Sequence, residues 1–324
     1  MRMTAEQITI AITVYDRRQY LVKAIDSALS QTVPVRVMVV EDCGPDPTIE
    51  AFVRSHYGGR APYHRNSKRR GIFGNLNACV ERCTTQWLSI LADDDYLEPG
   101  FVAAMIQLSE LAPGRALYFG DVTVVDERDR LLPRPFTNPS DPPWQPVDKL
   151  TAAHENPLPF PGQLFRGDVA QALGGFRESA FYVGDWELWM KMIAIHGAAK
   201  LNSPVAFLRH HGGTERGTTR VDRNGKKYGL INVQRKRNLA FLRQMGVNVQ
   251  FDRRVVHCQT IWAGTFLIKH GAGFSSRFLR YNIGLLLASQ APKWWLRVFK
   301  ITVCLLRRPA VLAAARLYKL TRAR

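Results

Sequence analysis

We predict an α/β fold built on a mostly parallel sheet, followed by a helical extension. Short apolar runs rich in Val and Ile alternate, along the first 125 residues, with segments whose apolar residues recur at helical spacing. This alternation is typical of a parallel sheet covered by helices on both faces. The 324-residue chain is 46% hydrophobic and 22% charged, which indicates an ordinary globular protein with ample core.

The first predicted elements are a strand, ITIAITV (8–14), an apolar helix at 20–32 and a second strand, VRVMVVED (35–42). The pattern then repeats with a helix near 47–56, a strand near 61–65, a helix at 73–83, a strand at 87–92, a helix at 99–111 and a strand at 116–125. Ligands of such sheets bind beyond the carboxyl ends of the strands.

Residues 126–160 are rich in Pro and polar residues, and they predict a long irregular connection of the kind that often borders a substrate cleft. The later elements are a strand and short helix within 161–176, an amphipathic helix at 185–197, a last strand at 205–211 and helical structure beyond 223.

The positive charge lies in the last third of the chain. Residues 1–227 hold 27 Lys+Arg and 26 Asp+Glu, whereas residues 228–324 hold 18 basic residues and one acid. The net charges of these parts are therefore +1 and +17, out of +18 for the chain. We predict one α/β domain at 1–227, with halves at about 1–125 and 126–227, and a basic amphipathic helical extension at 228–324.

In residues 275–320 of this extension, aromatic residues and Leu alternate with Arg and Lys. Helices of this composition lie in membrane interfaces, with basic groups on anionic lipid. The alternative is a helical subdomain that packs on the α/β domain. We expect no nucleic-acid binding, because no recognition motif accompanies the charge. We see no signal peptide and no run of 18 apolar residues, so we expect a cytoplasmic protein peripheral to the inner face of the membrane.

Three adjacent carboxylates, Asp93, Asp94 and Asp95, follow the buried strand at 87–92. Their mutual repulsion costs free energy unless a cation is present. Mg²⁺ and Mn²⁺ prefer carboxylate oxygens together with substrate phosphates. The segment therefore indicates a divalent metal site, and its alternative is a solvated acidic turn.

Two further segments suit a nucleotide. Asp42 ends another buried strand, where a carboxylate can accept hydrogen bonds from a base or ribose. Lys68, Arg69 and Arg70 precede the helix at 73–83, and a basic run before a helix start can hold a diphosphate. A solvated basic loop is the alternative. We assign Arg70, and Asn77 on that helix, to donor binding.

These motifs resemble glycosyltransferase family 2, whose fold is type A (GT-A). The matching segments are TVYDRRQYLVKAIDSALSQT, VVED-CGPD, GIFGNLNACVERC, WLSILADDDYLEPGF, FRGDVAQALGGFRESAFYVGDWELWMKM and FLRHHGG. They cover roughly residues 8–214 in the family's order. The resemblance implies an inverting transferase that moves a sugar from a nucleotide-diphosphate donor, commonly a UDP-sugar, with Mn²⁺ or Mg²⁺ bound at the DxD region.

The resemblance also implies a role for each matching residue. Thr13 and Tyr15 fall at the base, as does Asp42, and His211 falls near the diphosphate. Asp94 and Asp95 fall at the metal and the donor ribose, and we assign Asp93 and Asp94 to donor binding. The resemblance implies Asp94 and Asp95 as metal ligands and Asp185 as the catalytic base. On the acceptor side we assign Gly175, in the Gly-Gly-Phe turn, and Trp186, while Trp189 belongs to the core.

Two positions depart from the family pattern. The register gives Ala92-Asp93-Asp94 where the family has DxD, and Gly184 precedes Asp185 where the family has a second acid. Asp185 opens a predicted helix, whose dipole favours its ionised form, so it can remove the proton of an acceptor hydroxyl. The alternative for Asp185 is a simple helix N-cap.

The acceptor we expect is a glycan, lipid-linked or in cell-surface glycan assembly. One alternative function is a membrane-associated scaffold that keeps the fold and has impaired catalysis. Another is a nucleotidyltransferase, for which the Gly-rich phosphate loop after the first strand is missing.

Overall fold

The computed structural model describes residues 3–132, 142–180, 183–211 and 226–249. The chain divides into two compact units, Met1–Thr219 and Arg220–Arg324. The first unit contains a nine-stranded sheet in the order β3-β2-β1-β4-β8-β6-β9-β5, with β7 paired to β9.

One half of the sheet is parallel throughout. β1 (Ile8–Val14) lies between β2 (Arg36–Glu41) and β4 (Trp87–Ala92), and β3 (Tyr63–Arg65) pairs with the outer side of β2. β1, β2 and β4 are nearly continuous apolar runs because both of their faces are covered. The predicted strands of this half are confirmed to within two residues.

The other half is mixed. It contains β8 (Gln163–Arg166), β6 (Leu117–Val125), β9 (Ala198–Arg209), the two-residue β5 (Tyr96–Leu97) and β7 (Trp144–Pro146). β8 is antiparallel to both β4 and β6, and β6 is parallel to β9. Six of the nine strands therefore point the same way, which confirms a mostly parallel sheet.

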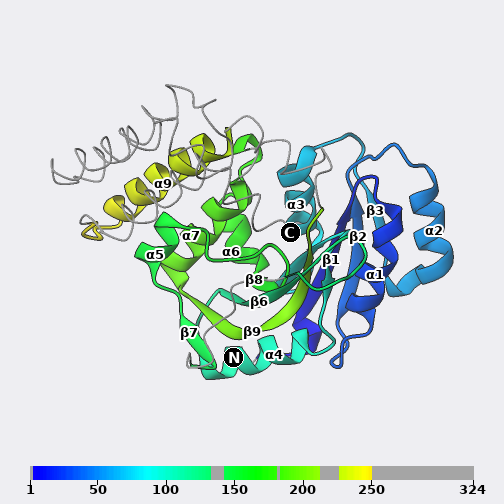
Figure 1. The fold of residues 1–324 in the computed structure, drawn as a ribbon, viewed down its shortest axis with the longest axis horizontal. Coiled ribbons are helices and arrows are strands. Elements are labelled where there is room, and N and C mark those ends of the chain that lie inside the picture. Colours follow the sequence, from blue (N-terminus) through cyan, green and yellow to red (C-terminus); the bar gives the residue numbers. More distant parts are fainter. Residues whose placement is uncertain (1–2, 133–141, 181–182, 212–225, 250–324) are drawn as a thin grey trace, which may run out of the picture. The chain divides into compact units, whose positions relative to one another are not determined.

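The main apolar core lies between one face of the sheet and three helices, which are α1 (Arg18–Leu29), α2 (Thr48–Tyr57) and α4 (Phe101–Leu111). Alternate residues of β1, from Ile8 to Val14, point into this core. α3 (Gly71–Arg82) also packs on β1, β2 and β4, and α7 (Gly184–His196) packs on β6. Figure 1 shows α1 and α2 beside the parallel half, and α6 (Gly167–Ala172) with α7 beside the mixed half.

Two sequence predictions need correction. The region 126–160 is not irregular throughout, since it contains β7 and α5 (Lys149–His154). α5 begins at Asp148, whose carboxylate caps it by accepting the Thr151 N–H at 2.7 Å. The last strand begins at Ala198 rather than at 205, because its first part pairs with β7.

The second unit is described only at its start, where α9 spans Lys226–Gln244. In the residues that the structure describes, we find no helix with the length and apolar character needed to cross a bilayer. The predicted membrane-interface segment at 275–320 lies outside the described residues.

Candidate active site

The topology brings four strand ends to one edge of the sheet. β2, β1 and β4 are parallel neighbours, so Asp42, Tyr15 and Asp93 follow strands that end side by side. β8 is antiparallel to both β4 and β6, so β4 and β6 run in the same direction. β9 is parallel to β6 and therefore also runs in the direction of β4. His211, two residues beyond β9, therefore reaches the edge that carries the carboxylates.

The turn that carries Asp93, Asp94 and Asp95 is held against β9 by hydrogen bonds. β5 continues the turn and pairs antiparallel to β9, with Tyr96 opposite Phe207. Asp95 accepts the backbone N–H of Arg209 at 2.9 Å, and Arg209 donates from Nε to the Asp94 carbonyl at 3.0 Å. Burial, together with the neighbouring Asp94 carboxylate, raises the pKa of Asp95 well above its usual range. The Asp95 side chain thus holds the turn against β9.

The Asp94 carboxylate contacts two side chains from other parts of the chain. Its Oδ2 atom lies 2.8 Å from Nε2 of His211 and also contacts Nη1 of Arg17. The other guanidinium nitrogen of Arg17 lies 2.5 Å from Oδ1 of Asp93. Burial raises the pKa of Asp93 to about 7, although Arg17 opposes that rise. Arg17 is thus the cation that neutralises this carboxylate pair within the protein.

Asp94 and His211 fit a hard divalent cation. Mn²⁺ accepts both carboxylate oxygen and imidazole nitrogen, and Mg²⁺ and Mn²⁺ sites commonly take their remaining ligands from water and substrate phosphate. Within the described ranges, no group of three or more His, Cys, Asp or Glu residues is arranged to hold a metal. Asp94 and His211 are therefore the two residues here that could hold such a cation, with phosphate and water as its remaining ligands. Asp95 as a second ligand stays a prediction, since its Oδ1 already bonds to the Arg209 backbone.

At the predicted base-binding end, the polar groups are engaged by the protein. Thr13 donates its hydroxyl to the Leu91 carbonyl at 3.3 Å, and the Arg69 guanidinium lies 4.5 Å above the Tyr15 ring. Asp42 is 4% exposed and accepts the backbone N–H of Arg70 at 2.7 Å and that of Gly71 at 2.8 Å.

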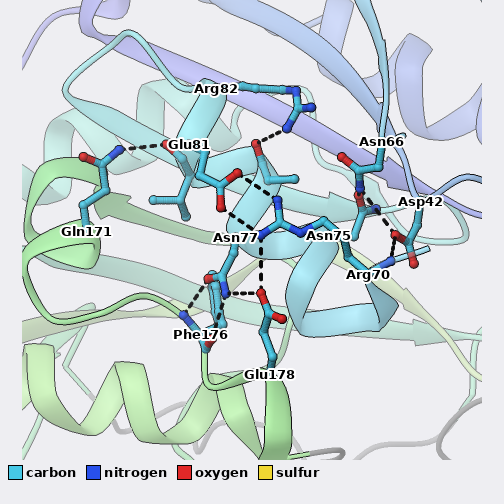
Figure 2. A network of polar contacts seen from close by, with 12 residues as sticks. Asp42, Asn66, Arg70, Asn75, Asn77, Glu81, Arg82, Gln171, Phe176 and Glu178 are labelled. Carbon is cyan, nitrogen blue, oxygen red and sulfur yellow. Dashed lines mark hydrogen bonds and ion pairs between the residues drawn. The ribbon is translucent and has the colours of Figure 1, made fainter. Parts of the chain in front are cut away.

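Figure 2 shows Asp42 at the start of α3, with the amide of Asn66 donating to the same carboxylate. This carboxylate caps α3 and complements its dipole.

Arg70 and Asn77 connect α3 to the Gly-Gly-Phe turn. Arg70 makes a bidentate pair with Glu81, with both distances at 2.8 Å, and reaches Glu178 at 3.3 Å. Asn77 accepts the Phe176 N–H at 2.8 Å and donates to its carbonyl at 2.9 Å, as Figure 2 shows. The structure therefore gives both side chains protein partners, and their assignment to donor binding stays a prediction.

Gly175 lies in the turn that packs against Asn77. Its φ of +66° lies in the left-handed region, and a Cβ there would stand 2.6 Å from Oδ1 of Asn77. The adjacent Gly174, with φ of +86°, has open space where its Cβ would be. The structure thus explains Gly175 by its packing on Asn77, and a role toward an acceptor stays a prediction.

Asp185 lies in the first turn of α7, one residue after Gly184. It is not the N-cap, which is Val183. Oδ2 of Asp185 accepts the Asn156 side-chain N–H at 3.1 Å. Burial raises the pKa of Asp185 above its usual value, against the lowering effect of nearby backbone N–H groups and of Asn156. A carboxylate with a raised pKa at a helix start is suited to proton abstraction.

Gly184 stands where the family has a second acid, and the neighbouring atoms leave no room for a side chain at this position. A Cβ at this position would lie 2.8 Å from the Arg177 carbonyl and 2.9 Å from a ring carbon of Phe73. Trp186 is 2% exposed and donates its indole N–H to the Ala152 carbonyl at 2.7 Å. The structure thus places Trp186 in the contact between α5 and α7, and its assignment to the acceptor side stays a prediction.

Trp189 is fully buried, as predicted, and packs edge-on against Phe165 and Phe176.

Sequence reasoning missed three residues that organise the site, which are Arg17, Asn156 and Arg209. Arg17 directly follows the Tyr-Asp turn at the end of β1, and this position beside a neighbouring acidic strand end was a usable signal. Asn156 lies in the segment read as irregular, and Arg209 in the FLRHH strand. Neither carries a local pattern that reveals its partner.

The fold and the arrangement of strand ends define a nucleotide-sugar transferase fold of the GT-A type. Residues 9–152 match the model of the family described as Glycosyl transferase family 2. These matched residues, somewhat under half of the chain, are similar to that family.

Among proteins of similar sequence is the succinoglycan biosynthesis protein ExoO of Rhizobium meliloti, which is 32% identical over 39% of this chain and 36% of its own length. The chain spans about a third of the length of the first curated relatives that it matches.

Two solved structures share the fold. TarS of S. aureus, residues 1–349 in complex with UDP-GlcNAc, has a TM-score of 0.58 and 14% identity, over 97% of this chain and 92% of TarS. The mannosyltransferase PcManGT of Pyrobaculum calidifontis, in complex with GDP-Man and Mn²⁺, has a TM-score of 0.55 and 15% identity, over 97% and 87% of the two chains. At these identities the likeness establishes the fold alone.

Proposed function

We propose that this protein transfers a sugar from a nucleotide-diphosphate donor to an acceptor hydroxyl in one inverting displacement. The observation that carries the proposal is the pairing of Asp94 with His211 at an edge where four strands end. The similarity of residues 9–152 to glycosyltransferase family 2 supports the reaction class. TarS with UDP-GlcNAc and PcManGT with GDP-Man support a nucleotide-sugar donor, and we favour a UDP-sugar.

The donor lies along the carboxyl ends of β1, β2 and β4 in this proposal. Thr13, Tyr15 and Asp42 border the base, with the Tyr15 ring available for stacking. Asp42 can meet a base only with an oxygen lone pair that the N–H groups of Arg70 and Gly71 leave free. The basic segment before α3 adds positive charge for the diphosphate.

Asp94 and His211 hold Mn²⁺ or Mg²⁺ together with the donor phosphates. When bound, the cation supplies charge neutralisation for the departing nucleoside diphosphate. The Mn²⁺ complex of PcManGT supports the presence of a divalent cation in this fold.

Asp185 acts as the general base. Its ionised carboxylate takes the proton of the acceptor hydroxyl as that oxygen attacks the anomeric carbon, and the bond to the diphosphate breaks on the opposite face. Burial favours proton uptake, because it raises the pKa of Asp185. Asn156 donates to the carboxylate and fixes which oxygen it presents.

We further propose that the acceptor is a glycan, lipid-linked or in cell-surface polysaccharide assembly, and that the protein binds the inner face of the membrane from the cytoplasm. The charge of +17 on residues 228–324 supports attraction to anionic lipid. ExoO, named for succinoglycan biosynthesis, supports a polysaccharide product. Flotation of the full chain with anionic vesicles at low salt, and its loss at high salt or with neutral lipid, tests this placement.

Calorimetric titration with UDP, with and without Mn²⁺, tests the donor site. We expect binding only with Mn²⁺, and a loss of at least tenfold in affinity for Asp94→Ala. Equal affinity in EDTA would remove the cation from the proposal. Hydrolysis of UDP-sugars in the presence of Mn²⁺ separates an active transferase from a scaffold with impaired catalysis.

A further inference from the structure

The Arg17 guanidinium lies at the carboxylates of Asp93 and Asp94, where a divalent cation is expected to bind. Arg17 is the N-cap residue of α1 and makes no hydrogen bond from its side chain to that helix. Its guanidinium instead reaches across from the end of β1 to the end of β4, where it pairs with Asp93 at 2.5 Å and with Asp94. One third of the side chain is exposed.

The carboxylates that Arg17 neutralises are nearly inaccessible to water. Asp93 is 2% exposed and Asp94 is 9% exposed. Two carboxylates in such a setting repel each other strongly, and a paired cation offsets that repulsion. His211 cannot replace Arg17 fully, because it contacts only Asp94 at close range and its Nδ1 is 3.9 Å from Glu127.

Arg17 and a bound divalent cation would compete for one carboxylate, that of Asp94. Oδ2 of Asp94 contacts both Nη1 of Arg17 and Nε2 of His211. A divalent cation held by Asp94 and His211 would lie close to this oxygen, and the guanidinium on it would be repelled by the second positive charge. Metal and Arg17 therefore exclude each other at Asp94.

We propose that Arg17 is the resident counter-ion of the Asp93–Asp94 pair and competes with the divalent cation for Asp94. This inference rests on the proposed function, since it takes the cation site from there. In the free protein, Arg17 keeps the carboxylates neutralised and makes the affinity for metal alone low. The site therefore fills with metal when an anionic donor arrives to offset the charge of the displaced guanidinium.

The test is titration of the full-length protein with Mn²⁺ alone, followed by the electron paramagnetic resonance signal of free Mn²⁺. We expect Arg17→Gln to bind Mn²⁺ at least tenfold more tightly than the wild type. Arg17→Lys keeps the charge and should remain close to the wild type. Arg18→Gln is the matched control, because it removes the same charge from the next residue, which is exposed and bonds to Thr48 at 3.2 Å. It should change the affinity by less than twofold.

A gain in affinity is diagnostic, because damage to the fold would weaken the site. If Arg17→Gln is destabilised, the rise in melting temperature caused by Mn²⁺ is compared instead, and it should be larger in the variant than in the wild type. Equal or weaker Mn²⁺ binding by Arg17→Gln, with Mn²⁺ bound by the wild type in the presence of UDP, would overturn the competition and leave the proposed function intact. Absence of Mn²⁺ binding by both proteins, with or without UDP, would overturn both.

Discussion

The carboxylate of Asp42 has a structural role that a substitution can measure. It is 4% exposed and accepts two backbone N–H groups, from Arg70 at 2.7 Å and from Gly71 at 2.8 Å, at the start of α3. A third donor, Nδ2 of Asn66, lies 3.3 Å away. Replacing Asp42 by Ala removes all three contacts and the negative charge at the helix N-terminus.

The expected loss can be worked from these contacts. Hydrogen bonds to a charged group contribute about 1.5–3 kcal/mol each, and loss of an N-cap side chain costs typically about 1 and up to about 2 kcal/mol. Arg70 and Gly71 are partly exposed, so water recovers part of the loss at their N–H groups. We therefore expect Asp42→Ala to reduce the free energy of unfolding by about 2–4 kcal/mol, a large share of the stability of an ordinary domain.

Urea unfolding of the full chain at pH 7 measures this loss as a shift in midpoint at constant slope. Asp46→Ala is a suitable control, because Asp46 also accepts from a helix start, at Thr48 N with 2.9 Å, but is only partly buried. It should cost clearly less. If the two variants lose the same stability, Asp42 does not cap α3 in the way described, and a role in donor binding alone would explain it better.

Three further predictions concern the Gly-Gly-Phe turn and α7. Gly175→Ala should lose about 1–3 kcal/mol, because its Cβ would meet Asn77, whereas Gly174→Ala carries only the cost of a left-handed backbone, about 1 kcal/mol; thermal unfolding of both variants separates the two effects. Trp186→Phe should lose about 1–3 kcal/mol by leaving a buried carbonyl of α5 unpaired, and should leave UDP affinity unchanged in calorimetry. Burial raises the pKa of Asp185, so the rate of sugar transfer should rise with pH through that raised pKa; a rate that is flat from pH 4 to 8 would contradict the base assignment.

The sign of the stability effect of Asp185 is opposite to that of its effect on rate. In the unfolded chain its carboxyl group ionises at its ordinary pKa, below the folded value. The folded state therefore holds the proton to higher pH, and the contribution of this group to stability falls as pH rises between the two values. Asp185→Asn should reduce this decline in an unfolding series over acidic pH.

The order of strands and helices in the first 125 residues could be predicted because period and composition agree along this part of the chain. Most of its strands are short apolar runs and its helices have one apolar face, so local pattern and final packing coincide. The prediction failed at β5 and β7, which contain two and three residues. Such strands exist through their pairing with β9, and a single sequence carries no sign of a distant partner.

The candidate site was predictable to the extent that it consists of strand ends. Asp42, Asp94 and Asp185 could be located because they follow or open regular elements. Their partners were harder to predict, because Arg17 and Arg209 reach Asp94 from segments 77 and 115 residues away in the chain. Of the two, only Arg17 carried a signal, through its place at the end of β1. Nor could the sequence show that Asp42 and Asn77 are engaged by the backbone of neighbouring elements.

The proposed role of Asp185 as the general base of a sugar transfer is open to one kinetic comparison. With a UDP-sugar selected by binding, Mn²⁺ and a glycan acceptor, kcat for transfer is measured for the wild type and for Asp185→Asn, together with the donor Kd. Loss of the base should lower kcat by about 10²-fold or more while the donor Kd stays the same. The Asn side chain keeps the shape of the carboxylate at the start of α7, so the fold is preserved. Transfer by Asp185→Asn at a near-normal rate, with normal donor binding, would contradict the claim and leave Asp185 as part of the helix start alone.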